Sequence, residues 1–72
     1  MGREMFGKIS RWPDLVGKTY IQARAQILSD RPGINVEELK EGDIVSVHHD
    51  PNRVRVFTSR PGHIVVEVPY VG

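Results

Sequence analysis

The side chains that could support acid–base or metal chemistry are three histidines and a few separated aspartates. His48 and His49 are adjacent, His63 lies farther along, and the chain contains no cysteine. Adjacent residues of an extended segment point to opposite sides, so His48 and His49 would not face one metal ion together. A chain of 72 residues also has little room for an enclosed substrate pocket. We therefore predict no enzyme activity, no catalytic residue, no bound metal and no cofactor. Three aspartates could act with the histidines as acid–base groups, but they do not change this prediction: Asp14, Asp43 and Asp50.

Two arginines follow the histidine pair in an alternating run. Arg53 and Arg55 are interleaved with Val54 and Val56, and Phe57 ends the run. Alternation with period two is typical of a strand with one buried face. In the simplest interpretation the valines point inward and the arginines form the solvated face.

One helix is predicted to lie ahead of these residues. Thr19-Tyr20-Ile21-Gln22 fits a capping box, in which Thr19 and Gln22 satisfy each other's backbone amides. We predict a helix from Tyr20 to Asp30, ended by Pro32-Gly33. The apolar side chains at helical spacing form its inner face: Tyr20, Ala23, Ile27 and Leu28.

After the helix the apolar pattern changes to period two. The β-branched runs Ile44–Val47, Arg53–Phe57 and Ile64–Val68 are predicted strands, and Asn35–Leu39 is a weaker one. No internal repeat is present. The fold class predicted from these elements is α+β, with one helix packed on a small mixed β-sheet.

The residues Asp50-Pro51-Asn52-Arg53 favour a type I turn, since aspartate and proline occupy the first two positions. On this local pattern alone, the turn would join Ile44–Val47 to Arg53–Phe57 as an ordinary hairpin.

Composition limits the classes of partner. Ten basic and nine acidic residues give a net charge of +1, which provides no strong field for nucleic acid or an anionic membrane. The first dozen residues, MGREMFGKISRW, contain charges and no apolar run long enough for a secretion signal. We expect a monomer without a nucleic-acid or membrane partner, and both a secreted and a cytoplasmic location stay open. Residues 1–10 are expected to be a flexible segment and residues 11–72 a single domain.

Three segments together resemble the potato inhibitor I family of serine-protease inhibitors. They are WPDLVG at Trp12–Gly17, GDIVSVHHDPNRVRVF at Gly42–Phe57 and VPYVG at Val68–Gly72. The resemblance covers residues 11–72, and NRVRVF is its most specific part. It implies that an extended, convex reactive-site loop replaces the hairpin and enters the active site of a serine endopeptidase as a substrate would.

The resemblance also implies a role for individual residues. By position, the scissile bond would be Val47-His48, and the Val47 side chain would enter the specificity pocket of the protease. A medium-sized apolar group suits elastase-, chymotrypsin- or subtilisin-like enzymes better than trypsin-like ones. Arg53, Arg55 and Gly72 would be the loop-bracing residues. The reactive-site loop would comprise Val45, Ser46, Val47, His48, His49 and Asp50.

The chain departs from the family pattern near this loop. His48 stands where the family usually has an acidic residue that pairs with the arginines, and Asp50 is the nearest alternative anion. Pro51 replaces a large apolar residue, while Glu37 and Glu38 occupy a stretch that is usually more apolar. These changes imply weaker support for the loop. The alternative function is therefore a non-inhibitory interaction or scaffold domain that retains the inhibitor fold.

Overall fold

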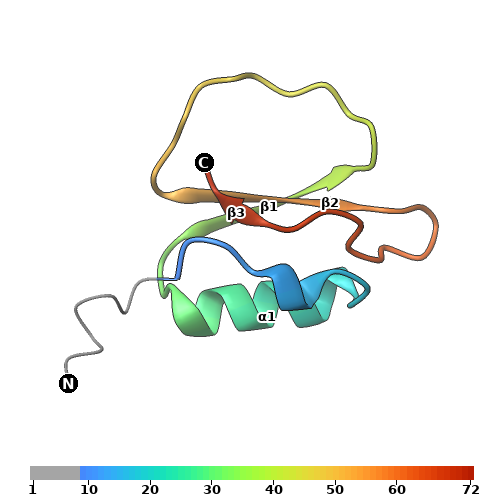
Figure 1. Cartoon of the computed structure of the whole chain (residues 1–72), viewed down its shortest axis with the longest axis horizontal. Coiled ribbons are helices and arrows are strands. Elements are labelled where there is room, and N and C mark those ends of the chain that lie inside the picture. Colours follow the sequence, from blue (N-terminus) through green and yellow to red (C-terminus); the bar gives the residue numbers. More distant parts are fainter. Residues whose placement is uncertain (1–8) are drawn as a thin grey trace.

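The computed structural model describes residues 9–72, so most of the predicted N-terminal segment 1–10 lies outside the described residues. Figure 1 shows one helix below a small sheet and a long loop above it. Along the described chain the elements are a short 3-10 helix η2 (Pro13–Leu15), α1 (Tyr20–Asp30), β1 (Asn35–Lys40), β2 (Arg53–Thr58) and β3 (Tyr70–Val71).

Helix α1 has the predicted bounds and the predicted cap. The Thr19 hydroxyl accepts from the Gln22 backbone N–H at 3.2 Å, and the Gln22 side-chain oxygen accepts from the Thr19 N–H at 3.0 Å. Ala23 and Ile27 are completely buried, which confirms the predicted inner face. The capping box thus fixes where the helix begins, and the apolar spacing fixes which side it buries.

The sheet has the strand order β1-β2-β3 and is mixed, as predicted. Strands β1 and β2 are parallel, with Asn35 beside Arg53 and Lys40 beside Thr58 at the two ends of the register. Strand β3 is antiparallel to β2 and pairs through Val71 and Tyr70.

Two strand predictions were wrong or too long. Ile44–Val47 forms no strand. The run Ile64–Val68 contributes only isolated bridges, between Ile64 and Thr19 and between Val65 and Thr58. The hairpin that the local pattern alone would favour does not form, because β2 pairs with β1 in the parallel sense and not with Ile44–Val47.

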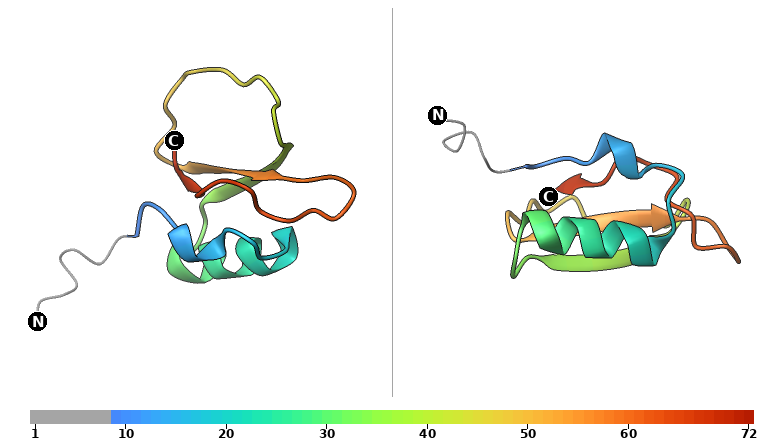
Figure 2. Two further views of the ribbon diagram at one scale, coloured as in Figure 1. Left: turned by 45° about the vertical axis from the view of Figure 1, so that its right-hand side comes forward. Right: turned by 90° about the horizontal axis from the view of Figure 1, so that it is seen from below.

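The core lies between α1 and one face of the sheet, as the two views in Figure 2 show. Val54 and Val56 of β2 are fully buried, as predicted from their alternation with the arginines. The other buried apolar side chains come from segments before β1 and from the segment after β2: Trp12, Leu15, Ala23, Ile27, Ile34 and Val65.

The parallel pairing dictates the shape of the connection between β1 and β2. A chain that leaves one end of β1 must return to the opposite end of the sheet before it can start a parallel strand. Residues 41–52 make this return, and we call them the crossover loop. The crossover loop arches away from the sheet on the side opposite α1 (Figure 1). The extended loop implied by the family resemblance is therefore a consequence of topology.

Candidate functional site

The crossover loop presents apolar side chains to solvent. Ile44 is 99% exposed and Val47 is 98% exposed, although both are β-branched residues that usually pack inside proteins. Val45, between them, is half-buried. Ile44 and Val47 thus contribute almost nothing to the core, and they are available to the surface of a binding partner.

Arg55 supports the loop ahead of Val47. Its Nη1 donates to the carbonyl oxygen of Ser46 at 2.9 Å, and its Nη2 donates to the Ser46 hydroxyl oxygen at 3.1 Å. The Arg55 side chain is 17% exposed, whereas Ser46 is exposed. Both the backbone and the side chain of Ser46 are therefore fixed to β2.

Arg53 supports the loop beyond Val47. Its Nη2 donates to the carbonyl oxygen of His48 at 2.6 Å and to that of Gly72 at 2.7 Å, and its Nε lies 3.1 Å from the same Gly72 oxygen. Charged donors make hydrogen bonds that are shorter and stronger than those between neutral groups. The two arginines thus hold one carbonyl on each side of Val47.

The segment after His49 is held by backbone hydrogen bonds. The Asp50 N–H donates to the Gly72 carbonyl at 3.1 Å, and the Arg53 N–H donates to the Asp50 carbonyl at 3.2 Å, which closes the predicted turn. The Asp50 carboxylate accepts from the Asn52 N–H at 2.9 Å. The structure gives Asp50 no ion pair with Arg53 or Arg55 in the described chain, so it does not replace the missing acid.

The carboxylate that lies beside the arginines comes from β1 instead. Glu37 Oε1 lies 3.9 Å from Arg55 Nε, and the two residues are partners in the parallel register. Glu37 and Arg55 lie far apart in the sequence, and only the parallel pairing brings them together. Only a prediction that β1 and β2 pair as parallel strands would have identified Glu37 as the partner of Arg55.

Gly72 joins the loop to the end of β3. Its N–H donates to the Arg53 carbonyl at 2.9 Å, and its φ of 149° is one that residues with a side chain rarely adopt. An added Cβ would lie 3.4 Å from His49 Nδ1 and 3.5 Å from the Tyr70 ring. The predicted scaffold position of Gly72 therefore depends on the absence of a side chain.

A cavity of about 180 Å³ lies under the loop. It is lined by Val45, Arg55, Phe57, Glu67, Val68, Tyr70 and Gly72. This space separates the loop from the sheet. The loop is held to β2 and to Gly72 by the arginine contacts and by the backbone hydrogen bonds of Asp50.

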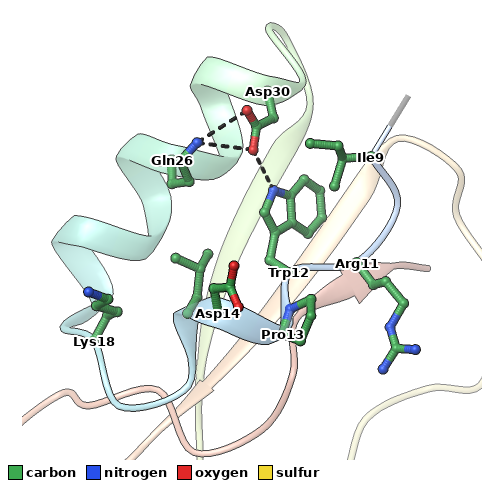
Figure 3. Close-up of a pocket in the computed structure, with 9 residues that line it drawn as sticks. Ile9, Arg11, Trp12, Pro13, Asp14, Lys18, Gln26 and Asp30 are labelled. Atoms are coloured by element: carbon green, nitrogen blue, oxygen red, sulfur yellow. Dashed lines mark hydrogen bonds between the residues drawn. The ribbon is translucent and has the colours of Figure 1, made fainter. Parts of the chain in front are cut away.

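A larger cavity, of about 460 Å³, lies beside Trp12 on the helix side of the molecule (Figure 3). Trp12 is 4% exposed, and its Nε1 donates to the Asp30 carboxylate at 2.8 Å. Gln26 donates to the same carboxylate. Trp12 and Leu15 are thus core residues, whereas Val16 is 45% exposed.

The histidines and acids do not gather elsewhere into a site. Within residues 9–72, no three His, Asp or Glu side chains are close enough to hold a metal ion together. His48 and His49 lie in the crossover loop, while His63 contacts Glu38 beside β2. In the same part of the chain, no helix combines the length and the apolar character needed to cross a membrane.

The arrangement offers an exposed peptide bond with its neighbours fixed. Val47-His48 lies between the two carbonyls that the arginines hold. A segment held in an extended shape can be bound by an enzyme without the cost of ordering it first. The site is therefore suited to recognition as a peptide substrate and not to chemistry of its own.

Comparisons with known proteins agree with this geometry. Residues 3–72 match the sequence model of the Potato inhibitor I family. The chain is 38% identical to Eglin C of Hirudo medicinalis over 69 residues, which cover 96% of this chain and 99% of Eglin C. It is 41% identical to the Chymotrypsin inhibitor of Lumbricus terrestris over 61 residues, which cover 85% of this chain and 70% of that protein. Among solved structures, it is similar to the bitter gourd trypsin inhibitor with a TM-score of 0.84 and 34% identity, over 90% of this chain and 94% of that one.

Proposed function

We propose that this chain, which belongs to the potato inhibitor I family, inhibits serine endopeptidases by inserting residues 45–50 of its crossover loop into the active site as a substrate would. The observation that carries the proposal is the pair of arginine contacts around an exposed residue. Arg55 holds Ser46, Arg53 holds His48, and Val47 between them is 98% exposed. We assign Val47-His48 as the scissile bond.

The mechanism follows from the rigidity of the loop. A flexible peptide loses about 0.5–1.5 kcal/mol for each side chain that must be ordered on binding, and a loop already in the bound shape avoids much of this cost. The protease supplies the serine nucleophile and attacks the Val47 carbonyl, which releases the amine of His48.

Slow net hydrolysis depends on what happens after that attack. The Arg53 contact to the His48 carbonyl holds the new amine near the acyl-enzyme. Its effective concentration there is high, so the peptide bond re-forms faster than water hydrolyses the acyl-enzyme. The chain thereby remains bound as an inhibitor.

The preferred target follows from Val47. A β-branched apolar side chain lacks the charge that a trypsin-like pocket requires and is too small to fill a deep aromatic pocket. We propose elastase-, chymotrypsin- or subtilisin-like enzymes as targets, with elastase-like enzymes favoured by pocket size. One loop per chain implies a complex of one inhibitor with one protease.

The test is a titration of elastase, chymotrypsin and subtilisin with the full chain, with mass spectrometry following cleavage after Val47. We expect stoichiometric loss of activity of at least one enzyme and slow cleavage at Val47-His48. Full activity of all three enzymes would favour a non-inhibitory interaction domain with the same fold. Rapid cleavage at this bond would show a loop that is presented but not held.

A further inference from the structure

Within the described residues, no acid of the crossover loop forms an ion pair with either of the two arginines under it. Between Ile44 and His49 there is no Asp or Glu, and the Asp50 carboxylate accepts from a backbone N–H of its own turn. Among residues 9–72, Arg55 forms its ion pair with Glu37 of β1, at 3.9 Å. A partly buried guanidinium without a counter-charge is costly, because burial removes the water that stabilises it.

The Arg55 guanidinium donates hydrogen bonds to Ser46 and lies within ion-pair distance of Glu37. The terminal nitrogens face Ser46 of the loop, at 2.9 Å and 3.1 Å, whereas Nε faces Glu37. A guanidinium is planar and rigid, so an attraction at Nε restricts the direction of the terminal nitrogens as well. Glu37 and Arg55 are opposite each other in the parallel register, which keeps the two side chains together.

We infer that Glu37 is a positioning residue for the loop. Its carboxylate orients Arg55, and Arg55 in turn holds Ser46 immediately ahead of Val47. The counter-charge of the loop support therefore comes from β1. The inference deepens the proposed function, on which it rests for its biological meaning. The contact between Glu37 and Arg55 affects the order of the loop, and loop order can be measured without a serine protease.

The test is the rate of loop cleavage by thermolysin, a metalloprotease that attacks flexible apolar segments, for the full chain and for Glu37→Gln. Glutamine has nearly the same shape as glutamate and removes only the charge. Because the Glu37 side chain is 49% exposed, we expect a rise of about two- to fivefold in the cleavage rate, as for other partly exposed ion pairs. Asp14→Asn, which removes the charge of an exposed acid in η2 outside the crossover loop, is the matched control and should leave the rate unchanged.

A second pair of variants separates positioning from general destabilisation. If Glu37 acts through Arg55, Glu37→Gln should have no further effect in an Arg55→Ala background. The melting temperature of Glu37→Gln should stay near that of the natural chain. The inference is overturned if Glu37→Gln leaves thermolysin cleavage unchanged, or if it raises cleavage by the same factor with and without Arg55.

The outcome for Glu37 is distinct from the outcome for the proposed function. If the unmodified chain does not inhibit serine proteases, the proposed function is refuted, whatever the rate of cleavage by thermolysin. With inhibition intact, Glu37→Gln should also speed cleavage of Val47-His48 by the inhibited enzyme by about the same two- to fivefold. If the inhibited enzyme cleaves Val47-His48 at an unchanged rate, Glu37 has no role in inhibition, and the assignment of the chain as an inhibitor is unaffected.

Discussion

The guanidinium of Arg53 lies 2.6 Å from the carbonyl oxygen of His48. The contact is to the backbone, so it does not depend on which side chain occupies position 48. The same nitrogen donates to Gly72 at 2.7 Å, which ties the loop to the end of β3. A histidine in place of an acid therefore leaves this part of the loop support intact.

Removal of Arg53 is expected to turn the inhibitor toward a substrate. Hydrogen bonds from charged groups contribute about 1.5–3 kcal/mol, so Arg53→Ala should speed cleavage of Val47-His48 by about 10- to 100-fold. Mass spectrometry of mixtures with subtilisin measures this rate directly. Arg24→Ala, on the exposed side of α1, is the control and should change nothing. Equal cleavage rates for Arg53→Ala and the control would refute the supporting role.

Substitution of Val47 is expected to change the target without changing the fold. The side chain is 98% exposed, so Val47→Phe should leave the melting temperature almost unaltered. It should strengthen inhibition of chymotrypsin and weaken inhibition of elastase, each by about 10-fold or more, because their specificity pockets differ in size. Inhibition constants for both enzymes give the answer. Ile21→Phe, a control at a 79% exposed site on α1, should change neither inhibition constant. If both variants change the constants alike, Val47 does not determine which protease is inhibited.

Gly72 and Gly62 form a matched pair for testing the scaffold. Gly72→Ala would force a side chain onto a φ of 149°. We expect a loss of about 1–3 kcal/mol in the free energy of unfolding, the usual cost of such backbone strain, and faster loop cleavage. At Gly62 an added Cβ would meet Ile64 at an ordinary 3.5 Å, so Gly62→Ala should be nearly neutral. Urea unfolding of both variants tests this difference, and equal stability would contradict it.

Acid pH is expected to destabilise the protein through Glu38. Burial alone would raise the pKa of Glu38, but hydrogen bonds from Thr58 and His63 and the charges of His63 and Arg60 outweigh it, so the pKa is lowered. The ordinary value is about 4.3. A carboxyl with a lowered pKa in the folded state contributes stability above its unfolded pKa, and this contribution is lost as the pH falls through the folded pKa.

The measurement is the free energy of unfolding in urea between about pH 6 and pH 2.5. In Glu38→Gln the part of the pH dependence that comes from this carboxyl should disappear, whereas Glu41→Gln should retain it. Glu38→Ala should in addition cost about 1–3 kcal/mol at neutral pH, because the completely buried Thr58 hydroxyl loses its acceptor at 2.6 Å. Parallel stability curves for the natural chain and Glu38→Gln would exclude this source of acid sensitivity.

The local features of the fold could be predicted from the sequence. The cap at Thr19 and the spacing of Ala23 and Ile27 act within a few residues, so the pattern alone located α1. The burial of Val54 and Val56 followed from alternation along one strand. In each case the signal and the structure it specifies lie in the same short segment.

The pairing of distant segments could not be predicted in this way. Ile44–Val47 has strand-like composition, yet it lies in the crossover loop with Ile44 and Val47 exposed to solvent, because β2 pairs with β1. Strand β3 is two residues long, too short for a periodic pattern. The ion pair of Glu37 with Arg55 needs the parallel register, which no local pattern encodes. Only the family resemblance pointed to an extended loop and to its arginines.

The shared core has a consequence for a molecule whose loop has been cut. Ala23 and Ile27 precede Val47-His48, whereas Val54 and Val56 follow it, and all four are completely buried in one cluster. After cleavage, each of the two fragments would carry part of the core, and neither fragment could bury its apolar side chains alone. The parallel pairing of β1 with β2 would still join the two fragments. Hydrolysis would thus yield a two-chain protein held together without a covalent link, with both cut ends still near each other.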